Sequence, residues 1–456
     1  MDELREFLKT AANLKPTERQ LKWYDREFYA FVHFSPNTYT GLEWGLGNED
    51  ERIFNPTELD CDQWVEAIKS AGMKGMILTA KHHDGFCLWP SKYTEHSVKN
   101  CPLDIDVVKE ASDACRRGGI EFGFYLSPWD RNSKLYGTDE YNDYYKKQLV
   151  ELLTGYGEIF CVWLDGACGE GPNGRKQVYD FDGIIELVRR YQPNAVIFQD
   201  GGPDVRWIGN EAGKCRPSEW AVIPNELAKL TSGPQTGPGP WYVPGVDQLD
   251  YIYNPQEDIG SANVIARSRG LNFCGAEVNM SIRPGWFYHP QEEPHSLERL
   301  MKTYLSSVGH NGCFNLNIPP MPNGKFDPRD VARLKELGDA LRAAFATDLA
   351  AGLKPVRTDR PAGNQCEFTL ELGQTRDVHY VELREPIALG QRVSGHRLMV
   401  RDEFGLWRDV CGGFTIGHKE IHKLSFFGHE SIKTDAVKVL ITSARDRVED
   451  IEISVY

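Results

Sequence analysis

The feature that most constrains the fold is a regular alternation of strand-like and helix-like segments over the first three-quarters of the chain. Short β-branched and aromatic runs predict strands at Phe28–Phe34, Gly75–Ala80, Glu121–Leu126, Ile159–Leu164, Ala195–Gln199, Leu271–Val278 and Gly312–Asn317. Amphipathic stretches between them predict helices at Cys61–Gly72, Asp104–Gly118, Thr138–Leu153, Phe181–Tyr191 and Ser296–Gly309. Asp60 and Ser296 are placed to cap helix N-termini, and Gly72 and Gly118 to end helices. Strands that alternate with helices of this length form parallel βαβ units.

The number of strand signals favours a closed barrel. Seven of them precede residue 320, and one further strand is easily missed, so we expect a (β/α)8-like barrel over residues 1–346. An open, doubly wound sheet is the alternative. No Gly-x-Gly-x-x-Gly follows the first strand, which weakens a dinucleotide-binding interpretation.

The pattern changes near residue 345. Asp330–Ala346 predicts one last helix, after which helix signals disappear. Short runs separated by turn residues then predict strands at Glu367–Leu372, Val378–Leu383, Gly395–Arg401, Asp409–Thr415, Glu420–Phe426 and Val437–Thr442. This spacing is typical of an antiparallel β-sandwich, which we expect over residues 347–456. Before it, the Pro/Gly-rich stretch Gly233–Gly245 predicts a long loop of functional importance.

Length and charge narrow the classes of function. A chain of 456 residues suggests two domains, and a hydrophobic share of 41% supplies ample core. The formal net charge of −14 and the lack of a Lys/Arg cluster argue against nucleic acid as a partner. No apolar run approaches the ~20 residues of a membrane span. The start Met1–Arg5 does not look like a signal peptide, so we expect a cytoplasmic protein, or a periplasmic or secreted one made without its leader.

The cysteines bear on the redox state and metal content of the protein, and the aromatic residues bear on its ligand. The eleven cysteines are scattered without a Cys-x-x-Cys pair, which indicates reduced thiols and neither a disulfide framework nor a zinc site. Eleven tryptophans and nineteen tyrosines mostly fill a core in a chain of this kind. They are also what a carbohydrate site needs, because apolar faces of sugar rings stack on aromatic side chains.

Polar residues gather where the predicted strands end. In a parallel barrel these ends meet on one face, which carries the chemistry. The strand ends in question carry His33, Lys81–Gly85, Tyr125, Trp163–Gly166, Asp200–Trp207 with Asn210 and Glu211, and Glu277. Strand ends are often exposed to solvent and therefore polar. Six successive strand ends that are rich in His, Trp and carboxylate residues nevertheless indicate an active site.

Asp165 is the first candidate for a catalytic carboxylate. It follows the apolar run Ile159–Leu164 and precedes a glycine, so a ligand has room in front of it. Cleaving an acetal requires a second carboxyl group that protonates the leaving oxygen. The candidates for that role are Asp204, Glu211 and Glu277, and Trp207 near Glu211 could raise its pKa by desolvation. The alternatives are a turn or capping role for Asp165 and an ordinary solvated loop glutamate for Glu211.

His82-His83-Asp84 suggests three different roles. Adjacent residues of a strand point to opposite faces, so the two imidazoles share a metal ion only if the backbone bends. They could instead hydrogen-bond neighbouring hydroxyls of a sugar, or form a satisfied pair in the core.

Several segments together resemble the α-L-fucosidases of glycoside hydrolase family 29. They are Phe31-Val32-His33-Phe34, Glu43-Trp44, Lys81-His82-His83-Asp84-Gly85-Phe86, Trp163-Leu164-Asp165-Gly166 and Arg206-Trp207. The resemblance runs through the barrel region, and the C-terminal sandwich is similar to the one those enzymes carry. It implies that Asp165 is the nucleophile. It also implies a fucose pocket lined by His33, Glu43, Trp44, His82, His83, Tyr125, Trp163, Arg206 and Trp286.

The resemblance to one subgroup of that family implies which residue is the second catalytic carboxylate. Arg206–Gly213 resembles the enzymes that act on α-1,3/1,4-linked fucose of Lewis-type branches, which implies that Glu211 is the acid/base, with Glu277 as the fallback. We therefore expect a retaining exo-α-L-fucosidase that needs no cofactor and acts on fucosylated oligosaccharides or glycoconjugates. Broader fucosidase specificity, a non-catalytic fucose-binding protein and a metal-dependent hydrolase using His82, His83 and Asp84 are the alternatives.

Overall fold

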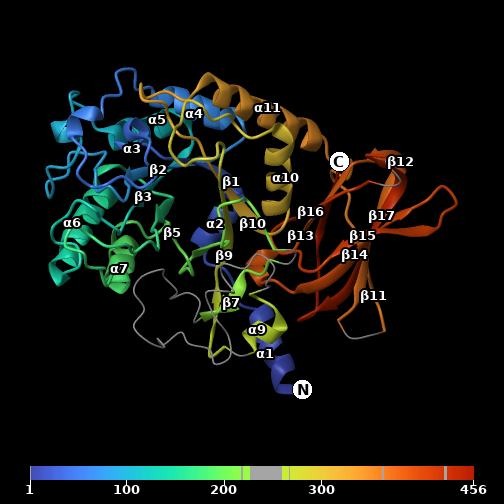
Figure 1. Cartoon of the computed structure of the whole chain (residues 1–456). Coiled ribbons are helices and arrows are strands. Elements are labelled where there is room, and N and C mark those ends of the chain that lie inside the picture. The colour runs from blue at the N-terminus through green and yellow to red at the C-terminus, as the bar shows by residue number, and fades with distance from the viewer. Residues whose placement is uncertain (1, 217–218, 226–258, 267, 362–363, 426–428) are drawn as a thin grey trace.

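Eight parallel strands form a closed barrel in the first part of the chain (Figure 1). The computed structural model describes residues 2–216, 219–225, 259–266, 268–361, 364–425 and 429–456. The barrel strands are β1 (Phe28–Val32), β2 (Gly75–Lys81), β3 (Glu121–Leu126), β4 (Cys161–Trp163), β5 (Val196–Gln199), β6 (Val205–Trp207), β9 (Gly275–Ser281) and β10 (Gly312–Asn317). The order β1-β10-β9-β6-β5-β4-β3-β2 closes the sheet because β10 pairs with β1.

Helices cover most of the outside of this barrel. Those of the described chain are α1 (Asp2–Ala12), α2 (Glu18–Arg26), α3 (Asn37–Thr40), α4 (Cys61–Ser70), α5 (Val107–Gly118), α6 (Asp139–Gly155), α7 (Phe181–Tyr191), α9 (Ala262–Ile265), α10 (Leu297–Ser307) and α11 (Pro328–Phe345). The predicted caps are confirmed, since Asp60 accepts from the Gln63 N–H and Ser296 from the Arg299 N–H. The stop of α5 is Gly119, with φ of 70°, and not Gly118 as predicted.

Two strand predictions are corrected by the structure. β6 was not predicted, because its three residues follow β5 after only a short turn, and no helix separates the two. Leu271–Val278, predicted as one strand, is two. β8 (Leu271–Phe273) pairs with β7 (Val222–Pro224) outside the barrel, and only β9 continues into it. Glu277 therefore lies within the seventh barrel strand and not at the end of the sixth.

The C-terminal part consists of antiparallel sheets, as predicted (Figure 1, right-hand side). A five-stranded sheet has the order β11 (Val356–Asp359), β12 (Cys366–Val378), β17 (Ile432–Ala444), β14 (Val393–Arg401) and β15 (Trp407–Gly413). A three-stranded sheet has the order β16 (Glu420–Lys423), β13 (Tyr380–Arg384) and β18 (Glu452–Val455). The expected fold class, a (β/α)8-like barrel followed by a β-sandwich, is confirmed.

The barrel and the sandwich meet through buried charges. Glu27, just before β1, lies 3.1 Å from the Arg384 guanidinium, 2.8 Å from Lys419 Nζ and 3.3 Å from His418 Nε2. Burial opposes ionisation of Glu27, but these three groups hold its pKa well below the usual value. We propose a domain boundary at 346/347, because α11 ends at Phe345 and a separate apolar cluster begins with Ala350.

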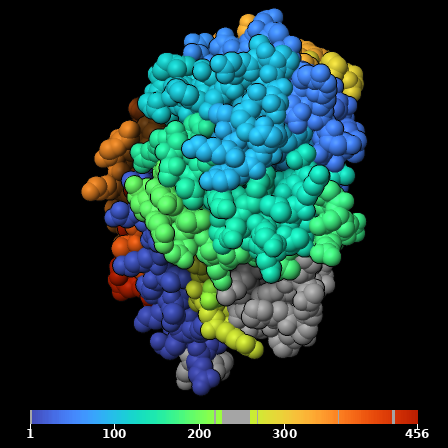
Figure 2. Space-filling view, turned by 90° about the vertical axis from the view of Figure 1, so that its left-hand side faces the viewer, coloured from blue at the N-terminus to red at the C-terminus, as the bar shows by residue number. Residues whose placement is uncertain are grey.

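One outer face of the molecule is formed mainly by the first half of the chain. On the face shown in Figure 2, light-blue segments near residue 100 lie at the top, the teal and green region of α6 and α7 lies across the middle, and the dark-blue N-terminal helices lie at the lower left. Within the described ranges, no helix is both long and apolar enough to cross a bilayer. The predicted loop Gly233–Gly245 lies outside the described residues.

Candidate active site

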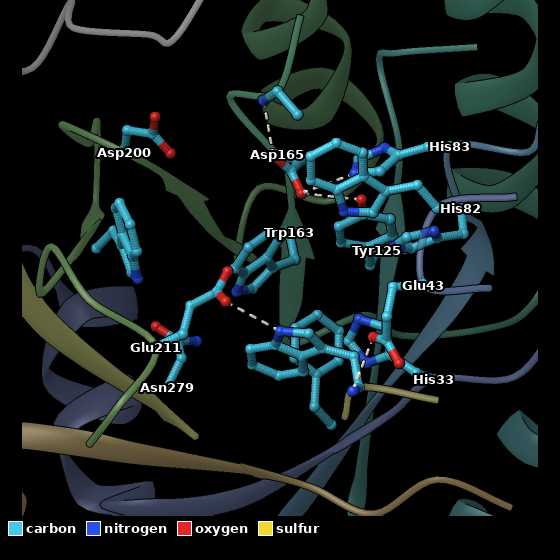
Figure 3. A pocket seen from close by; sticks show the side chains of 15 residues that line it. His33, Glu43, His82, His83, Tyr125, Trp163, Asp165, Asp200, Glu211 and Asn279 are labelled. Atoms are coloured by element: carbon cyan, nitrogen blue, oxygen red, sulfur yellow. Dashed lines mark hydrogen bonds and ion pairs between the residues drawn. The ribbon is translucent and has the colours of Figure 1, made fainter. Parts of the chain in front are cut away.

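A cavity of about 320 Å³ opens at the C-terminal ends of the barrel strands (Figure 3). Its volume falls at the lower end of the range for small-molecule sites, ~300–1,000 Å³. The residues that line it are Phe31, His33, Glu43, Trp44, His82, His83, Tyr125, Trp163, Asp165, Ala167, Asp200, Trp207, Glu211, Asn279 and Trp286. The structure thus brings together all but one of the predicted pocket residues, together with both predicted catalytic carboxylates.

Asp165 lies two residues beyond the end of β4. Its Oδ2 accepts a hydrogen bond of 2.9 Å from the Tyr125 hydroxyl, and its Oδ1 accepts one of 2.7 Å from the Ala167 N–H. Its side chain is about 25% exposed, so the carboxylate is anchored from behind and open to the cavity. Such an arrangement suits a carboxylate that must approach a ligand atom from a fixed direction.

His83 presents an unprotonated nitrogen to the cavity. The Ser127 hydroxyl donates to the Trp129 carbonyl at 2.6 Å, so its oxygen accepts from His83 Nδ1 at 2.7 Å. The neutral ring then carries its proton on Nδ1 and a lone pair on Nε2, which lies 3.9 Å from Asp165 Oδ2. Burial lowers the pKa of His83, which keeps this neutral form at pH 7.

His33 is fixed in the same tautomer by another neighbour. Asn317 Oδ1 accepts from the His33 backbone N–H at 3.2 Å and from Nδ1 at 2.8 Å. The Asn317 amide group donates to the Ser281 hydroxyl and the Trp286 carbonyl, which sets its orientation. Burial lowers the pKa of His33 to about 3 and that of His82 well below its usual value. Three neutral imidazoles therefore face the cavity, and they suit neutral hydroxyl groups better than an anion.

The His82-His83 pair converges because the backbone turns after Lys81, where β2 ends. A hydrogen bond from the Gly85 N–H to the His82 carbonyl closes this turn, and the ring centroids lie 4.2 Å apart. Asp84 does not join them, because its carboxylate accepts from the Ser35 hydroxyl and the Phe86 N–H. The arrangement therefore favours the sugar-binding interpretation over a metal-ligand triad.

Aromatic rings form the apolar wall. Trp163 stacks on Phe198 at a centroid distance of 4.0 Å, and its Nε1 donates to Glu277 at 2.8 Å. The Phe31 ring lies 5.2 Å from Trp163 and 6.4 Å from Trp286. A flat sugar ring can stack on such a wall while its hydroxyls face the imidazoles.

Glu211 enters the cavity from the loop that follows β6. In Figure 3 its carboxylate points inward from the side opposite the His82–His83 pair. Its Oε2 accepts a 3.1 Å hydrogen bond from the Trp286 indole N–H. Partial removal from water raises the pKa of Glu211, and the nearby Asp165 and Glu43 carboxylates raise it further, whereas the indole lowers it. A raised pKa is what a general acid at neutral pH requires.

Glu277, the fallback candidate, does not line the cavity. It is fully buried inside the barrel, where it accepts from Trp163, Asn279 and Asn315 at 2.8, 2.7 and 3.1 Å and from the Tyr29 hydroxyl. Burial raises its pKa, against these hydrogen bonds. Glu277 thus holds the Trp163 ring in place from beneath the cavity.

Two further sequence candidates lie elsewhere. Asp204 is buried between Arg19 and Arg189, at 3.2 and 2.6 Å, and plays a structural part. Arg206, expected in the sugar pocket, is instead fully buried outside it, where it binds Glu219 and donates to the Trp220 carbonyl at 3.0 Å. Successive residues of a strand alternate in direction, so Trp207 faces the cavity and Arg206 faces away.

Glu43 and Trp44 form the rim. Glu43 accepts from the Trp286 N–H at 2.9 Å and from His289 Nε2 at 2.9 Å, which ties two loops together. Trp44 is 61% exposed and packs edge-to-face on Trp129 at 5.7 Å. Its free face is available to a group that extends out of the cavity.

Some lining residues were not assigned to the site from the sequence. Asn279 follows Glu277 by two positions on β9, so the period-2 pattern of a strand could have indicated it. Asp200 and Trp207 were noted as polar or aromatic strand ends but not as pocket residues. Phe31 and Ala167 carry no signal that separates them from core residues.

Comparisons with known proteins agree with this site. Residues 10–344 match the family model described as alpha-L-fucosidase. The chain is 38% identical to alpha-L-fucosidase 1 of Arabidopsis thaliana over 94% of its own length and 85% of the plant protein. A solved glycoside hydrolase 29 family member from a rumen bacterium has a TM-score of 0.81 at 35% identity, over 98% of this chain and 78% of that one.

A second similar structure was solved with a sugar bound. The Ruminococcus gnavus GH29 fucosidase, solved in complex with fucose, matches with a TM-score of 0.81 at 27% identity, over 97% of this chain and 95% of that chain. The fold, the cavity at the strand ends and these similarities agree with one another. The chain belongs to the α-L-fucosidases of glycoside hydrolase family 29.

Proposed function

We propose that this α-L-fucosidase retains the anomeric configuration, with Asp165 as nucleophile and Glu211 as acid/base. The observation that carries the proposal is that these two carboxyl groups project into one cavity from different loops (Figure 3). A retaining mechanism requires about 5–5.5 Å between them, against ~6.5–9.5 Å for inversion. NMR of the released, unreduced fucose at early times, before mutarotation, tests the assignment, since retention releases α-fucose first and inversion releases β-fucose.

The reaction proceeds in two displacements. An Asp165 oxygen attacks the anomeric carbon while the bond to the leaving oxygen breaks, and Glu211 gives that oxygen its proton. The product is a β-linked fucosyl ester of Asp165. Glu211, now a carboxylate, removes a proton from water, and the water oxygen displaces Asp165. Tyr125 and the Ala167 N–H keep the Asp165 carboxylate oriented through both steps.

The choice of Glu211 over the other carboxylates is supported by position. Glu277 is enclosed by four donors beneath the cavity, and Asp204 is held by two arginines. A general acid must reach the leaving oxygen, which points out of the cavity. Glu211 lines the cavity and is exposed to solvent, so it is placed to reach such an oxygen.

We propose that the sugar is held by one polar and one apolar wall. His33, His82 and His83 provide acceptor nitrogens for hydroxyl protons. Trp163 and Trp286 cover the apolar side that carries the C6 methyl group. No residue of this proposal requires a cofactor.

We further propose a preference for α-1,3/1,4-linked fucose in branched glycans. In such substrates a galactose lies beside the fucose and extends over the rim. The exposed Trp44 ring offers a stacking surface there, and Glu211 sits on a loop that this contact could order. Binding energy from the branch would then appear as a faster chemical step.

Specificity constants for different linkages test this preference. We expect kcat/KM for Lewis a and Lewis x trisaccharides to exceed that for 2′-fucosyllactose and for aryl fucosides by at least ~10-fold. Trp44→Ala should reduce the Lewis x value more than the aryl fucoside value. If the kcat/KM values for all linkages lie within a few-fold of one another, the enzyme instead has broad specificity and recognises only the fucose.

The pH profile tests the pairing of Glu211 with Trp286. The alkaline limb of kcat/KM reports the pKa of the group that must be protonated in the free enzyme. The indole N–H favours the carboxylate and lowers the pKa of Glu211, so Trp286→Phe should move this limb to higher pH. Trp44→Phe, which removes no hydrogen bond to Glu211, is the control. An unmoved limb, or one at lower pH, would contradict the pairing.

A further inference from the structure

Three buried titratable side chains meet at the seam between the barrel and the C-terminal sheets, away from the sugar pocket. His396 is on β14, and Glu420 and His422 are on β16. They are 1%, 6% and 9% exposed. One ligand atom of each lies within 4.8 Å of the ligand atoms of the other two. Within the described residues, no other group of three His, Cys, Asp or Glu side chains meets this criterion.

The two imidazoles are turned toward each other through their Nε2 atoms, which are 2.8 Å apart. His396 Nδ1 lies 3.2 Å from the Phe414 carbonyl, which can only accept, so Nδ1 carries the proton of the neutral ring. Nε2 of His396 then carries a lone pair that is directed at the cluster. A histidine whose Nδ1–H is held by a backbone carbonyl is the common arrangement of a metal ligand that binds through Nε2.

Glu420 has no compensating charge in this arrangement. Nothing in the described part of the chain donates a hydrogen bond to its carboxyl group, and burial alone raises its pKa. The neighbouring Lys419 does not serve it, because that ammonium binds Glu27 and Glu382. A buried carboxylate next to neutral imidazoles is costly unless a cation or a proton neutralises it.

A fourth nitrogen lies at the edge of the cluster. His310 Nδ1 is buried, makes no hydrogen bond to any described residue, and is 3.9 Å from Glu420 Oε2. His310 belongs to the barrel, just before β10, whereas the other three belong to the sandwich. The barrel therefore contributes an unpartnered nitrogen to a cluster whose other members belong to the sandwich.

The backbone is shaped to make room for these rings. Gly413 on β15 lies opposite His396 in the sheet. A Cβ atom at Gly413 would come within 2.7 Å of His396 Cε1, so any other residue would displace the ring. The imidazole is thus held at a defined position by close packing.

We propose that His396, Glu420 and His422 bind a divalent cation of the zinc class, with His310 in place to complete the set. Two imidazole nitrogens and one carboxylate oxygen are a ligand set that suits Zn²⁺ and disfavours Ca²⁺ or Mg²⁺. Donor atoms around a tetrahedral Zn²⁺ lie about 3.3 Å apart, so the imidazole pair opens by roughly 0.5 Å and the carboxylate closes in.

The position of the site indicates a structural role. β10 begins at Gly312, so His310 is at the N-terminal face of the barrel, opposite the sugar cavity. Backbone hydrogen bonds already join the two parts here, from the Ile421 N–H to the Gly309 carbonyl and from the Asn311 N–H to the Lys419 carbonyl. A cation bound by β14, β16 and His310 would fasten the sandwich to the barrel and stabilise the folded chain.

Metal binding by the full, tag-free chain tests the proposal. Protein dialysed against EDTA and then against buffer is titrated with Zn²⁺ in competition with a chromophoric chelator, and the bound metal is counted by mass spectrometry. We expect one Zn²⁺ per chain and a raised Tm. His396→Gln and His422→Gln should each weaken binding by more than ~10-fold and abolish the Tm increase. His379→Gln, at an exposed histidine of the same domain, is the matched control.

Fucosidase turnover on an aryl fucoside shows that each variant is folded, because the cluster lies far from the cavity. Glu420→Gln, which keeps the shape of the side chain, serves if a histidine variant does not fold. Absence of stoichiometric Zn²⁺ from the wild-type chain would overturn the proposal, and the cluster would then be a protonated hydrogen-bond network. Unchanged Zn²⁺ affinity in the folded cluster variants would overturn it as well.

Discussion

Replacing Asp165 with alanine is expected to lower kcat by roughly 10⁴-fold or more while leaving the fold intact. The covalent route disappears with the nucleophile, and the remaining pocket can only bind the sugar. The side chain is partly exposed and contributes two hydrogen bonds, so its loss does not open the core. The measurements are turnover of an aryl fucoside, circular dichroism and calorimetric binding of fucose.

Azide makes this experiment specific for the nucleophile. In Asp165→Ala the anion can occupy the space of the missing carboxylate and attack the substrate directly, which inverts the centre and yields β-fucosyl azide. The anomer is identified by NMR. A folded Asp165→Ala protein that turns over at a near-normal rate would remove Asp165 from the mechanism.

Replacing Glu211 with alanine is expected to produce a different defect. Loss of the general acid should lower kcat/KM by roughly 10²–10⁴-fold for sugar leaving groups, and far less for aryl groups that depart without a proton. Azide should accelerate the second step by replacing the water that Glu211 activates. Because azide then attacks the fucosyl ester, the product is α-fucosyl azide, the opposite anomer from that of Asp165→Ala.

Glu277 provides the control for this assignment. Glu277→Gln should disturb Trp163 and lower stability, because the buried carboxylate accepts from four donors, and azide should not rescue it. If the leaving-group dependence and the azide rescue appear in the Glu277 variant and not in Glu211→Ala, the role of acid/base passes to Glu277.

The strand pattern predicted the barrel because parallel strands bury both faces and read as apolar runs. β3 and β10 occur at the predicted residues, and α7 does too. β6 was not predicted because a run of three residues with an arginine in its centre cannot be distinguished from a loop.

The site was predictable where a residue lies just past a strand, because the chain direction alone brings it to the catalytic face. Asp165 and His33 are such residues. Arg206 was expected in the pocket from the family resemblance. Its strand, β6, was not recognised, so no alternation was available to show that its side chain points away from the cavity.

The sequence alone therefore indicated the alternation of strands and helices, the sandwich that follows and the position of Asp165 at a strand end, since these depend on local period and chain direction. Only the tertiary structure places Glu211 at the cavity and Glu277 and Asp204 away from it, because burial and partners come from segments far apart in the chain. The same holds for the cluster of His396, Glu420 and His422. Alternation puts Glu420 and His422 on one face of β16, but His396 reaches them from another strand through packing of the two sheets.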